Sequence, residues 1–63
     1  MKNTILRLKQ VKNKTGLARS TIYFLIAQNN FPKQISLGGR AVGWIEHEIE
    51  EWISHKIAYS RKN

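Results

Sequence analysis

A glycine at position 16 separates two short helical patterns, and this break constrains the fold more than any other feature of the chain. Before Gly16, side chains with i, i+3, i+7 spacing predict a helix over residues 9–15. Gly16 can then provide the left-handed residue that commonly ends a helix. After it, apolar residues at i, i+3 and i+4 predict a second helix over 19–28. Two helices joined by a short turn with a glycine form a helix-turn-helix arrangement, which alone is a weak signal because many small helical proteins show it.

A glycine pair farther along the chain predicts a β-hairpin. Pro32 prevents the second helix from continuing. The β-prone segments 34–37 and 41–45 follow, and the residues between them are Gly38, Gly39 and Arg40. A glycine pair in this position is typical of a two-residue hairpin whose central residues both have positive φ. The hairpin tip is therefore expected to carry Arg40.

The last helix is predicted over residues 46–60. Its apolar stripe, with helical spacing, consists of Ile45, Ile49, Trp52, Ile53 and Ile57. Its acidic residues lie in the first two turns and its basic residues near the end, which complements the helix dipole. We therefore attribute the acids to helix stability rather than to catalysis. The aromatic residues expected in the core are Phe31, Trp44, Trp52 and Tyr59.

The size of the chain limits what it can build around this framework. With 63 residues and no cysteine, it can form one small core without disulfides or a thiolate metal site. Its longest apolar run, 22–27, is far shorter than the ~20 residues that span a bilayer, and the amino terminus lacks a signal-peptide pattern. A soluble cytoplasmic protein is expected.

Residues 5–8, which precede the first predicted helix, suggest a short strand or an extended lead-in.

The charge is distributed very unevenly. The chain has a net charge of +7, yet its four acids all lie within residues 46–51. Residues 1–45 contain eight Lys and Arg residues and no acid. An acid-free basic region on a folded domain attracts polyanions, above all nucleic acid. A basic surface that only confers solubility is the alternative, and an anionic membrane is disfavoured because no long basic amphipathic helix is present.

Three groups of residues could suggest a metal site, a catalytic nucleophile or a nucleotide-binding loop, but each has a simpler explanation. His47, Glu51 and His55 recur at i, i+4, i+8 and could present a metal, but this stripe is expected in solvent without a fourth ligand. No buried acid is available to orient a histidine for a nucleophile. The glycine pair is followed by a β-prone segment, whereas nucleotide-binding loops lead into a helix. We therefore expect no enzyme activity, no metal and no cofactor.

Several segments together resemble the AlpA family of prophage regulatory proteins. They are RLKQVKNKTGLARSTIYFLI, NFPKQISLGGRAVGW and EIEEWI, which cover about residues 6–57. The family is similar to winged-helix excisionases and to the DNA-binding part of MerR-type regulators. The resemblance implies a bacterial or phage protein that binds DNA near integrase genes or attachment sites. It also implies that the protein activates integrase expression or serves as an excisionase.

Three positions depart from the family pattern. Residue 18, usually a hydroxyl residue that caps the recognition helix, is Ala18. Residue 24, usually basic or polar, is Phe24, and residue 45, often proline, is Ile45. The change at Phe24 alters the expected pattern of base contacts, so the operator sequence does not follow from the resemblance.

The expected fold is mainly α with a small β-hairpin: a winged helix-turn-helix with three helices and a two-stranded wing. It forms one domain over residues 1–63, with 1–4 and 61–63 flexible. The second helix is expected to enter the major groove of double-stranded DNA, with the wing beside it. A protein-interaction adaptor that recruits or modulates an integrase is the alternative function, and a small RNA-binding protein is a third. Several copies are expected on one DNA, in the cytoplasm and associated with the nucleoid.

The expected DNA contacts fall into three sets. The recognition helix provides Arg19, Ser20, Thr21, Tyr23 and Phe24. The wing provides Gly38, Gly39 and Arg40. The electrostatic contacts to the DNA backbone come from Lys9, Lys12, Lys14 and Lys33. Among these, Arg19 is expected to contact a guanine or a phosphate, and Arg40 a phosphate or the minor groove.

Overall fold

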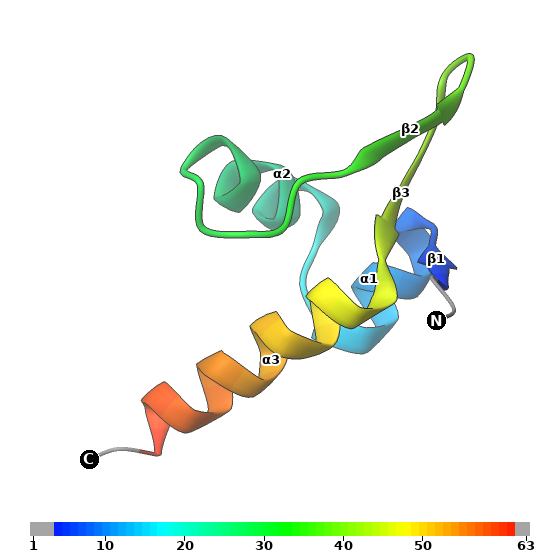
Figure 1. Cartoon of the computed structure of the whole chain (residues 1–63). Coiled ribbons are helices and arrows are strands. Elements are labelled where there is room, and N and C mark those ends of the chain that lie inside the picture. The colour runs from blue at the N-terminus through cyan, green and yellow to red at the C-terminus, as the bar shows by residue number, and fades with distance from the viewer. Residues whose placement is uncertain (1–3, 62–63) are drawn as a thin grey trace.

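The computed structural model describes residues 4–61 and contains three helices and three short strands (Figure 1). Their order is β1 (Ile5–Leu6), α1 (Leu8–Thr15), α2 (Arg19–Ala27), β2 (Ile35–Gly38), β3 (Ala41–Ile45) and α3 (Glu46–Ser60). The three helices have the predicted positions to within one residue at each end. The hairpin formed by β2 and β3 projects from the body as a wing, which confirms the winged helix-turn-helix fold.

The sheet has three strands, because β1 joins the two strands of the predicted wing; it lies within residues 5–8, for which the sequence suggests a short strand or an extended lead-in. Its order is β1-β3-β2, and both pairings are antiparallel. In β1, Ile5 pairs with Ile45, and the next hydrogen bond joins the Glu46 N–H to the Thr4 carbonyl at 2.8 Å. Gly43 lies at the centre of β3, where a Cβ would come within 2.6 Å of the Ile5 Cγ2. A glycine here lets the side chains of the neighbouring strands close over β3.

Every element contributes to a single small core. The buried apolar side chains come one each from β1, α1, α2, the loop before β2, β3 and α3: Leu6, Val11, Ile22, Phe31, Trp44 and Ile49. Trp44 is the largest of the fully buried side chains. Its indole N–H donates to the Pro32 carbonyl at 3.1 Å, so the polar end of the ring is satisfied. Burial of this ring joins the sheet to the loop that follows α2.

The turn between α1 and α2 is closed by Thr15 and Gly16. Gly16 adopts the left-handed conformation, with φ of 72°, and its N–H donates to the Lys12 carbonyl at 2.8 Å. The Thr15 hydroxyl donates to the Val11 carbonyl at 2.8 Å and accepts from the Leu17 N–H at 3.2 Å. The Gly16 bond satisfies a carbonyl that the end of α1 would otherwise leave free, and the Thr15 hydroxyl gives the Leu17 N–H a partner in the turn. The predicted glycine stop is confirmed.

The hairpin turn differs by one residue from the prediction. Gly38 is the last residue of β2 and pairs with Ala41, so the two central residues are Gly39 and Arg40. Of these two, only Gly39 has a positive φ, at 54°. The reason is an irregular register between Ser36 and Gly38, where Gly38 itself takes a φ of 108°. Arg40 lies at the tip as expected.

Two residues assigned to the apolar interior are exposed instead. Ile57 is 47% exposed and Tyr59 is 77% exposed, because α3 continues past the last element that could cover it. The expected flexibility of residues 1–3 and 62–63 lies outside the described residues. At the margins of the described part, Thr4 is bonded to α3 and the Arg61 N–H donates to the Ile57 carbonyl at 3.0 Å.

The start of α2 lacks a side-chain cap. Ala18 occupies the N-cap with extended backbone, and its side chain has no oxygen to accept from the first free N–H groups. We expect Ala18→Ser to raise the free energy of unfolding by about 0.5–2 kcal/mol, because the hydroxyl would satisfy one of these donors. Thermal and urea denaturation of the two proteins measure the gain. Ala18→Val provides the control without a hydroxyl, and equal stability of the Ser and Val variants would contradict the capping explanation.

Candidate nucleic-acid interface

One side of α2 is buried and the other is open to solvent. Ile22 is fully buried, and Leu25 and Ile26 are half-buried against the core. The opposite side presents Ser20, Phe24 and Ala27, all exposed. Phe24 is 60% exposed, which is unusual for a phenylalanine at the middle of a short helix. This open face is the part of α2 that a ligand can reach.

The first turn of α2 is held in place by a row of aromatic contacts. The Arg19 guanidinium carbon lies 5.6 Å from the centre of the Tyr23 ring. Tyr23, which is half-buried, meets Trp44 edge-on with 6.3 Å between ring centres. Trp44 is in turn bonded to the loop after α2. The exposed cation of Arg19 therefore rests on a ring that the core fixes in position.

The wing extends from the same half of the molecule as α2 and away from α3 (Figure 1). Its tip is formed by Gly39 and Arg40, which are both exposed. The Gly38 N–H donates to the Ser36 hydroxyl at 3.4 Å, a long bond that helps to turn the strand. Arg40 has no acidic residue nearby in the sequence and ends the wing with a positive charge.

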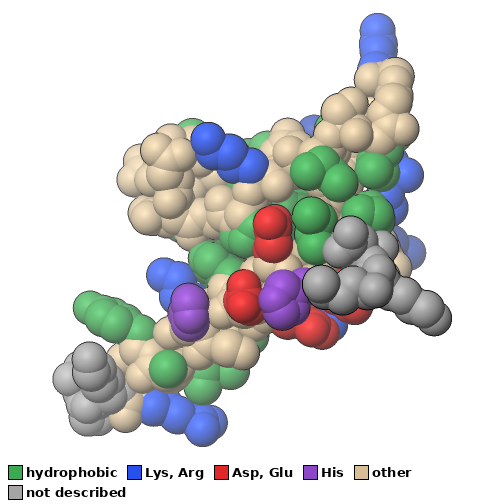
Figure 2. Space-filling model, viewed as in Figure 1, with side chains coloured by type: hydrophobic (Ala, Val, Ile, Leu, Met, Phe, Trp, Pro, Cys, Tyr) green, Lys and Arg blue, Asp and Glu red, His purple; other side chains and the backbone are tan. Residues whose placement is uncertain are grey.

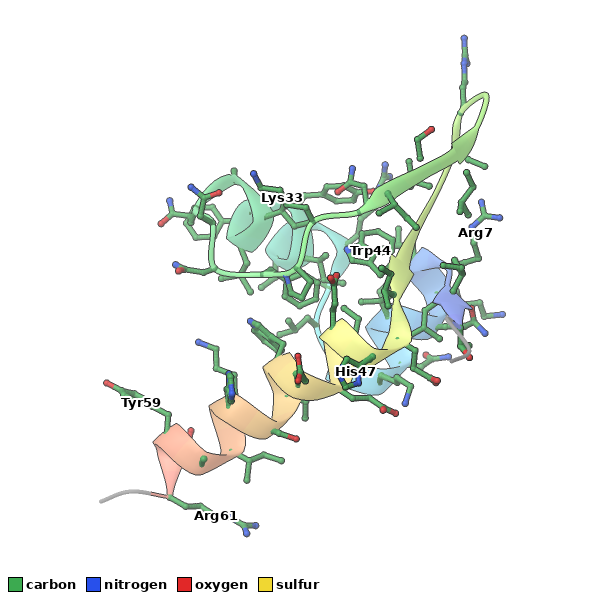
Figure 3. The ribbon with its side chains drawn as sticks, in the orientation of Figure 1. Arg7, Lys33, Trp44, His47, Tyr59 and Arg61 are labelled. Carbon is green, nitrogen blue, oxygen red and sulfur yellow. The ribbon has the colours of Figure 1, made fainter. Side chains whose placement is uncertain are left out.

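The four lysines expected to contact the DNA backbone have different surroundings. Lys9 and Lys12 are exposed on α1, and Lys33 is exposed in the loop before β2 (Figure 3). Lys14 instead faces α3: its ammonium lies 3.1 Å from Glu50 Oε2 and 3.8 Å from Glu46 Oε2. These two carboxylates offset its charge, so Lys14 contributes less than the other three lysines to a positive surface.

The acids form a separate surface over α3. Figure 2 shows the carboxylates and both histidines together over this helix, apart from the basic side chains near the wing. His47 Nε2 lies 3.3 Å from Glu51 Oε2, and both side chains are largely exposed. Within residues 4–61 no three metal-ligating side chains converge on one point. The same part of the chain has no helix long and apolar enough to cross a membrane.

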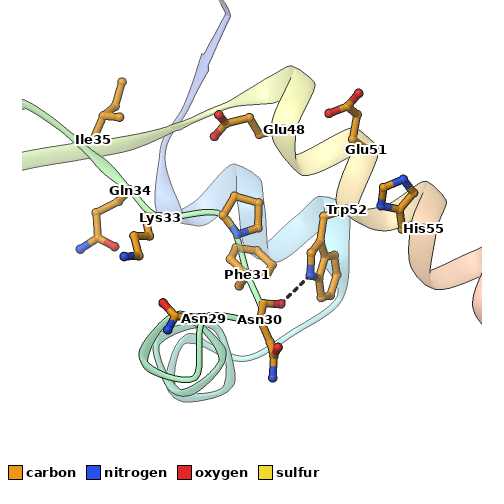
Figure 4. Close-up of a pocket in the computed structure, with 11 residues that line it drawn as sticks. Asn29, Asn30, Phe31, Lys33, Gln34, Ile35, Glu48, Glu51, Trp52 and His55 are labelled. Carbon is orange, nitrogen blue, oxygen red and sulfur yellow. Dashed lines mark hydrogen bonds between the residues drawn. The ribbon is translucent and has the colours of Figure 1, made fainter.

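A cleft separates α3 from the loop that follows α2 (Figure 4). It is shallow and widely open to solvent, with a volume of about 650 Å³. Its aromatic wall consists of Phe31 and Trp52, which meet edge-on with 4.7 Å between ring centres. The Trp52 indole N–H donates to the Asn30 carbonyl at 2.7 Å. Periodicity alone could not reveal this cleft, since it forms between residues far apart in the sequence.

Comparison with known proteins identifies the family. Residues 4–57 match the family model described as prophage CP4-57 regulatory protein (AlpA). The chain belongs to the AlpA family. It is 48% identical over 58 residues to the DNA-binding transcriptional activator AlpA of Escherichia coli K12, an alignment that covers 82% of this chain and 83% of that protein.

A second relative comes from a phage. The chain is 47% identical over 53 residues to the uncharacterized protein ORF88 of enterobacteria phage P4. This alignment covers 84% of the chain and 60% of the phage protein, so the chain matches less than two thirds of that relative's length. The family model and the Escherichia coli relative confirm the resemblance that the sequence motifs predict.

Proposed function

We propose that the protein binds double-stranded DNA sequence-specifically, with α2 in the major groove and the wing against the neighbouring backbone. The observation that carries the proposal is the separation between the surface of α2 and the wing and the acidic surface of α3. An exposed face of α2 and an arginine-tipped wing lie in one half of the molecule, while every acid lies on α3. Because phosphates repel carboxylates, this arrangement favours one orientation on a duplex. The DNA-binding name of the Escherichia coli relative supports the same conclusion.

The exposed side chains suit different parts of the duplex. Arg19 lies at the start of α2, where the residues of a recognition helix come closest to base edges, and its planar fork suits a guanine. The hydroxyls of Ser20 and Thr21, together with free N–H groups in the first helical turn, suit a phosphate or a base edge. Tyr23 contacts the sugar-phosphate backbone of the DNA beside these residues. On the wing, Gly38 and Gly39 give Arg40 access to a phosphate or the minor groove.

The family points to a prophage or another integrative element as the setting. The protein acts there by binding rather than by catalysis, as a transcriptional regulator of integrase expression, as an excisionase, or as both. One module of this size buries only ~600–1,000 Å² on DNA, so several copies on adjacent sites provide the specificity. This proposal locates the protein in the bacterial cytoplasm with the nucleoid, and an integrase is its expected protein partner.

Salt-dependent binding is the experiment that tests the proposal. A duplex from the integrase region of the host element, a scrambled duplex and an RNA duplex of matched sequence are titrated with the protein at several salt concentrations. We expect affinity to fall steeply with salt and to be highest for the native DNA duplex. Equal affinity for RNA would favour an RNA-binding protein. No binding to any duplex at low salt would leave an adaptor function as the better explanation.

Phe24 offers a test of base contact within this proposal. We expect Phe24→Ala to weaken binding to the specific duplex more than binding to the scrambled one, because the exposed ring can contact a thymine methyl group. The melting temperature should change little, since the ring is 60% exposed and outside the core. Binding to the scrambled duplex serves as the internal control. A loss of stability above about 2 kcal/mol would show instead that Phe24 packs within the fold.

A further inference from the structure

Two polar side chains lie where the chain passes from α2 to the wing, and neither belongs to the three sets of expected DNA contacts. Gln34 directly precedes β2 and is half-buried, and Ser36 lies within β2 and is exposed. None of the side-chain hydrogen bonds among residues 4–61 involves the Gln34 amide. The Ser36 hydroxyl accepts from the Gly38 N–H, so its own proton is available for another partner. Both side chains can therefore donate a hydrogen bond to a ligand.

Ser36 lies on the side of the sheet that faces α2. It pairs with Val42 of β3, and side chains that are paired across two strands share one side of a sheet. Trp44 is two residues farther along β3 and shares that side as well. There the Trp44 ring meets Tyr23 of α2. The hydroxyl of Ser36 is thus on the side of the wing turned toward the recognition helix.

Gln34 lies on the same side as Ser36. Side chains alternate along an extended chain, so residues 34 and 36 share one side and Ile35 lies on the other. Figure 4 shows this arrangement, with Gln34 and Lys33 on the α2 side of the chain and Ile35 and Glu48 on the opposite side. Although Gln34 and Glu48 both border the cleft, the amide is turned away from the carboxylate. A phosphate can approach the amide without meeting the acids of α3.

We propose that Gln34 and Ser36 donate hydrogen bonds to the phosphates of the DNA strand that passes between α2 and the wing. The inference rests on the proposed function, which places α2 in the major groove and the wing against the neighbouring backbone. The strand that borders the groove must then cross the residues joining these two elements. Residues 34 and 36 are about 7 Å apart along the extended chain, so both reach the same short stretch of that strand.

The chemistry of this contact differs from that of Arg40 at the wing tip. An amide N–H and a hydroxyl can bond a phosphate oxygen, but neither carries a charge. The slope of log K against log salt is set by the cations that displace counterions from DNA. Loss of Gln34 or Ser36 should therefore lower affinity without changing this slope, and it should do so on any DNA sequence.

The first test compares affinities. Gln34→Ala and Ser36→Ala are titrated against the native and scrambled duplexes at several salt concentrations, and we expect each to bind both duplexes roughly tenfold more weakly than the parent, with an unchanged salt slope. Ser54→Ala is the matched control, because residue 54 is exposed on α3, and it should bind like the parent. Ser36→Thr keeps the hydroxyl and should keep the affinity, which separates a lost contact from a damaged hairpin. A loss confined to the native duplex would indicate a base contact and overturn the proposal.

The second test locates the contact on the DNA. In a series of duplexes, one phosphate at a time is replaced by an uncharged methylphosphonate, and the parent should lose affinity at each contacted position. We expect Gln34→Ala and Ser36→Ala to lose this sensitivity at one or two adjacent positions, and Arg40→Ala to lose it at a different one. If both variants kept the full pattern of the parent, the contact would be absent and the DNA-binding proposal would stand. Failure of the parent to bind any duplex would overturn both.

Discussion

Trp44→Ala is expected to leave most of the protein unfolded at 25 °C. The ring is fully buried, and removal of a buried tryptophan typically costs about 3–5 kcal/mol. A domain of this size without disulfides has a total stability of the same order. The loss of Trp44 affects several elements at once, because its ring contacts Tyr23 of α2 and its indole N–H donates to the Pro32 carbonyl in the loop after α2. Far-UV circular dichroism during urea denaturation measures the outcome.

Trp44→Phe separates the ring from its hydrogen bond. Phenylalanine retains most of the apolar surface but leaves the Pro32 carbonyl without its partner, for which a cost of about 1–3 kcal/mol is expected. The phenylalanine variant should therefore remain largely folded and the alanine variant should not. If Trp44→Ala unfolded with the same urea midpoint as the parent, the burial of this ring would not be what stabilises the domain.

The features that could be predicted from the sequence are those set by local chemistry. Gly16 ends α1 because few other residues adopt its φ of 72° without strain. The start of α3 could be predicted because three signals coincide there. The β-prone segment ends at Ile45, the acids begin at Glu46, and the apolar residues take helical spacing from Ile45 onward. The exposed face of α2 follows from helical spacing, and the exposure of Phe24 on that face is therefore predictable from the sequence.

The features that could not be predicted depend on distant neighbours. Residues 5–8 are compatible with either a strand or an extended lead-in from the sequence alone, and the pairing of Ile5 with Ile45 decides between them. Tyr59 continues the helix pattern past the end of the core, and periodicity does not show where covering elements stop. Lys14 counts as one more basic residue in the sequence, while in the fold it is paired with Glu50. Charge totals therefore overestimate the basic surface.

Arg19→Ala is expected to weaken binding to the specific duplex more than binding to a random duplex. If Arg19 contacts a guanine, its loss should weaken specific binding by about 1–3 kcal/mol, which is roughly 5- to 150-fold in Kd. A phosphate contact carries no sequence information, so binding to a scrambled duplex should fall much less. Tyr23, packed between Arg19 and Trp44, should keep the fold intact in this variant. Fluorescence anisotropy with both duplexes provides the comparison.

Arg40→Ala provides the matched control, because the wing is expected to contact the backbone. Its loss should weaken both duplexes equally and lower the slope of log K against log salt by about 0.9, the value for one phosphate contact. Lys14→Ala should change that slope less, since two carboxylates already offset the charge of Lys14. The contrast between the two arginines is the decisive measurement. If Arg19→Ala also weakened both duplexes equally, α2 would be binding phosphates, and the bases would have to be contacted elsewhere on the protein.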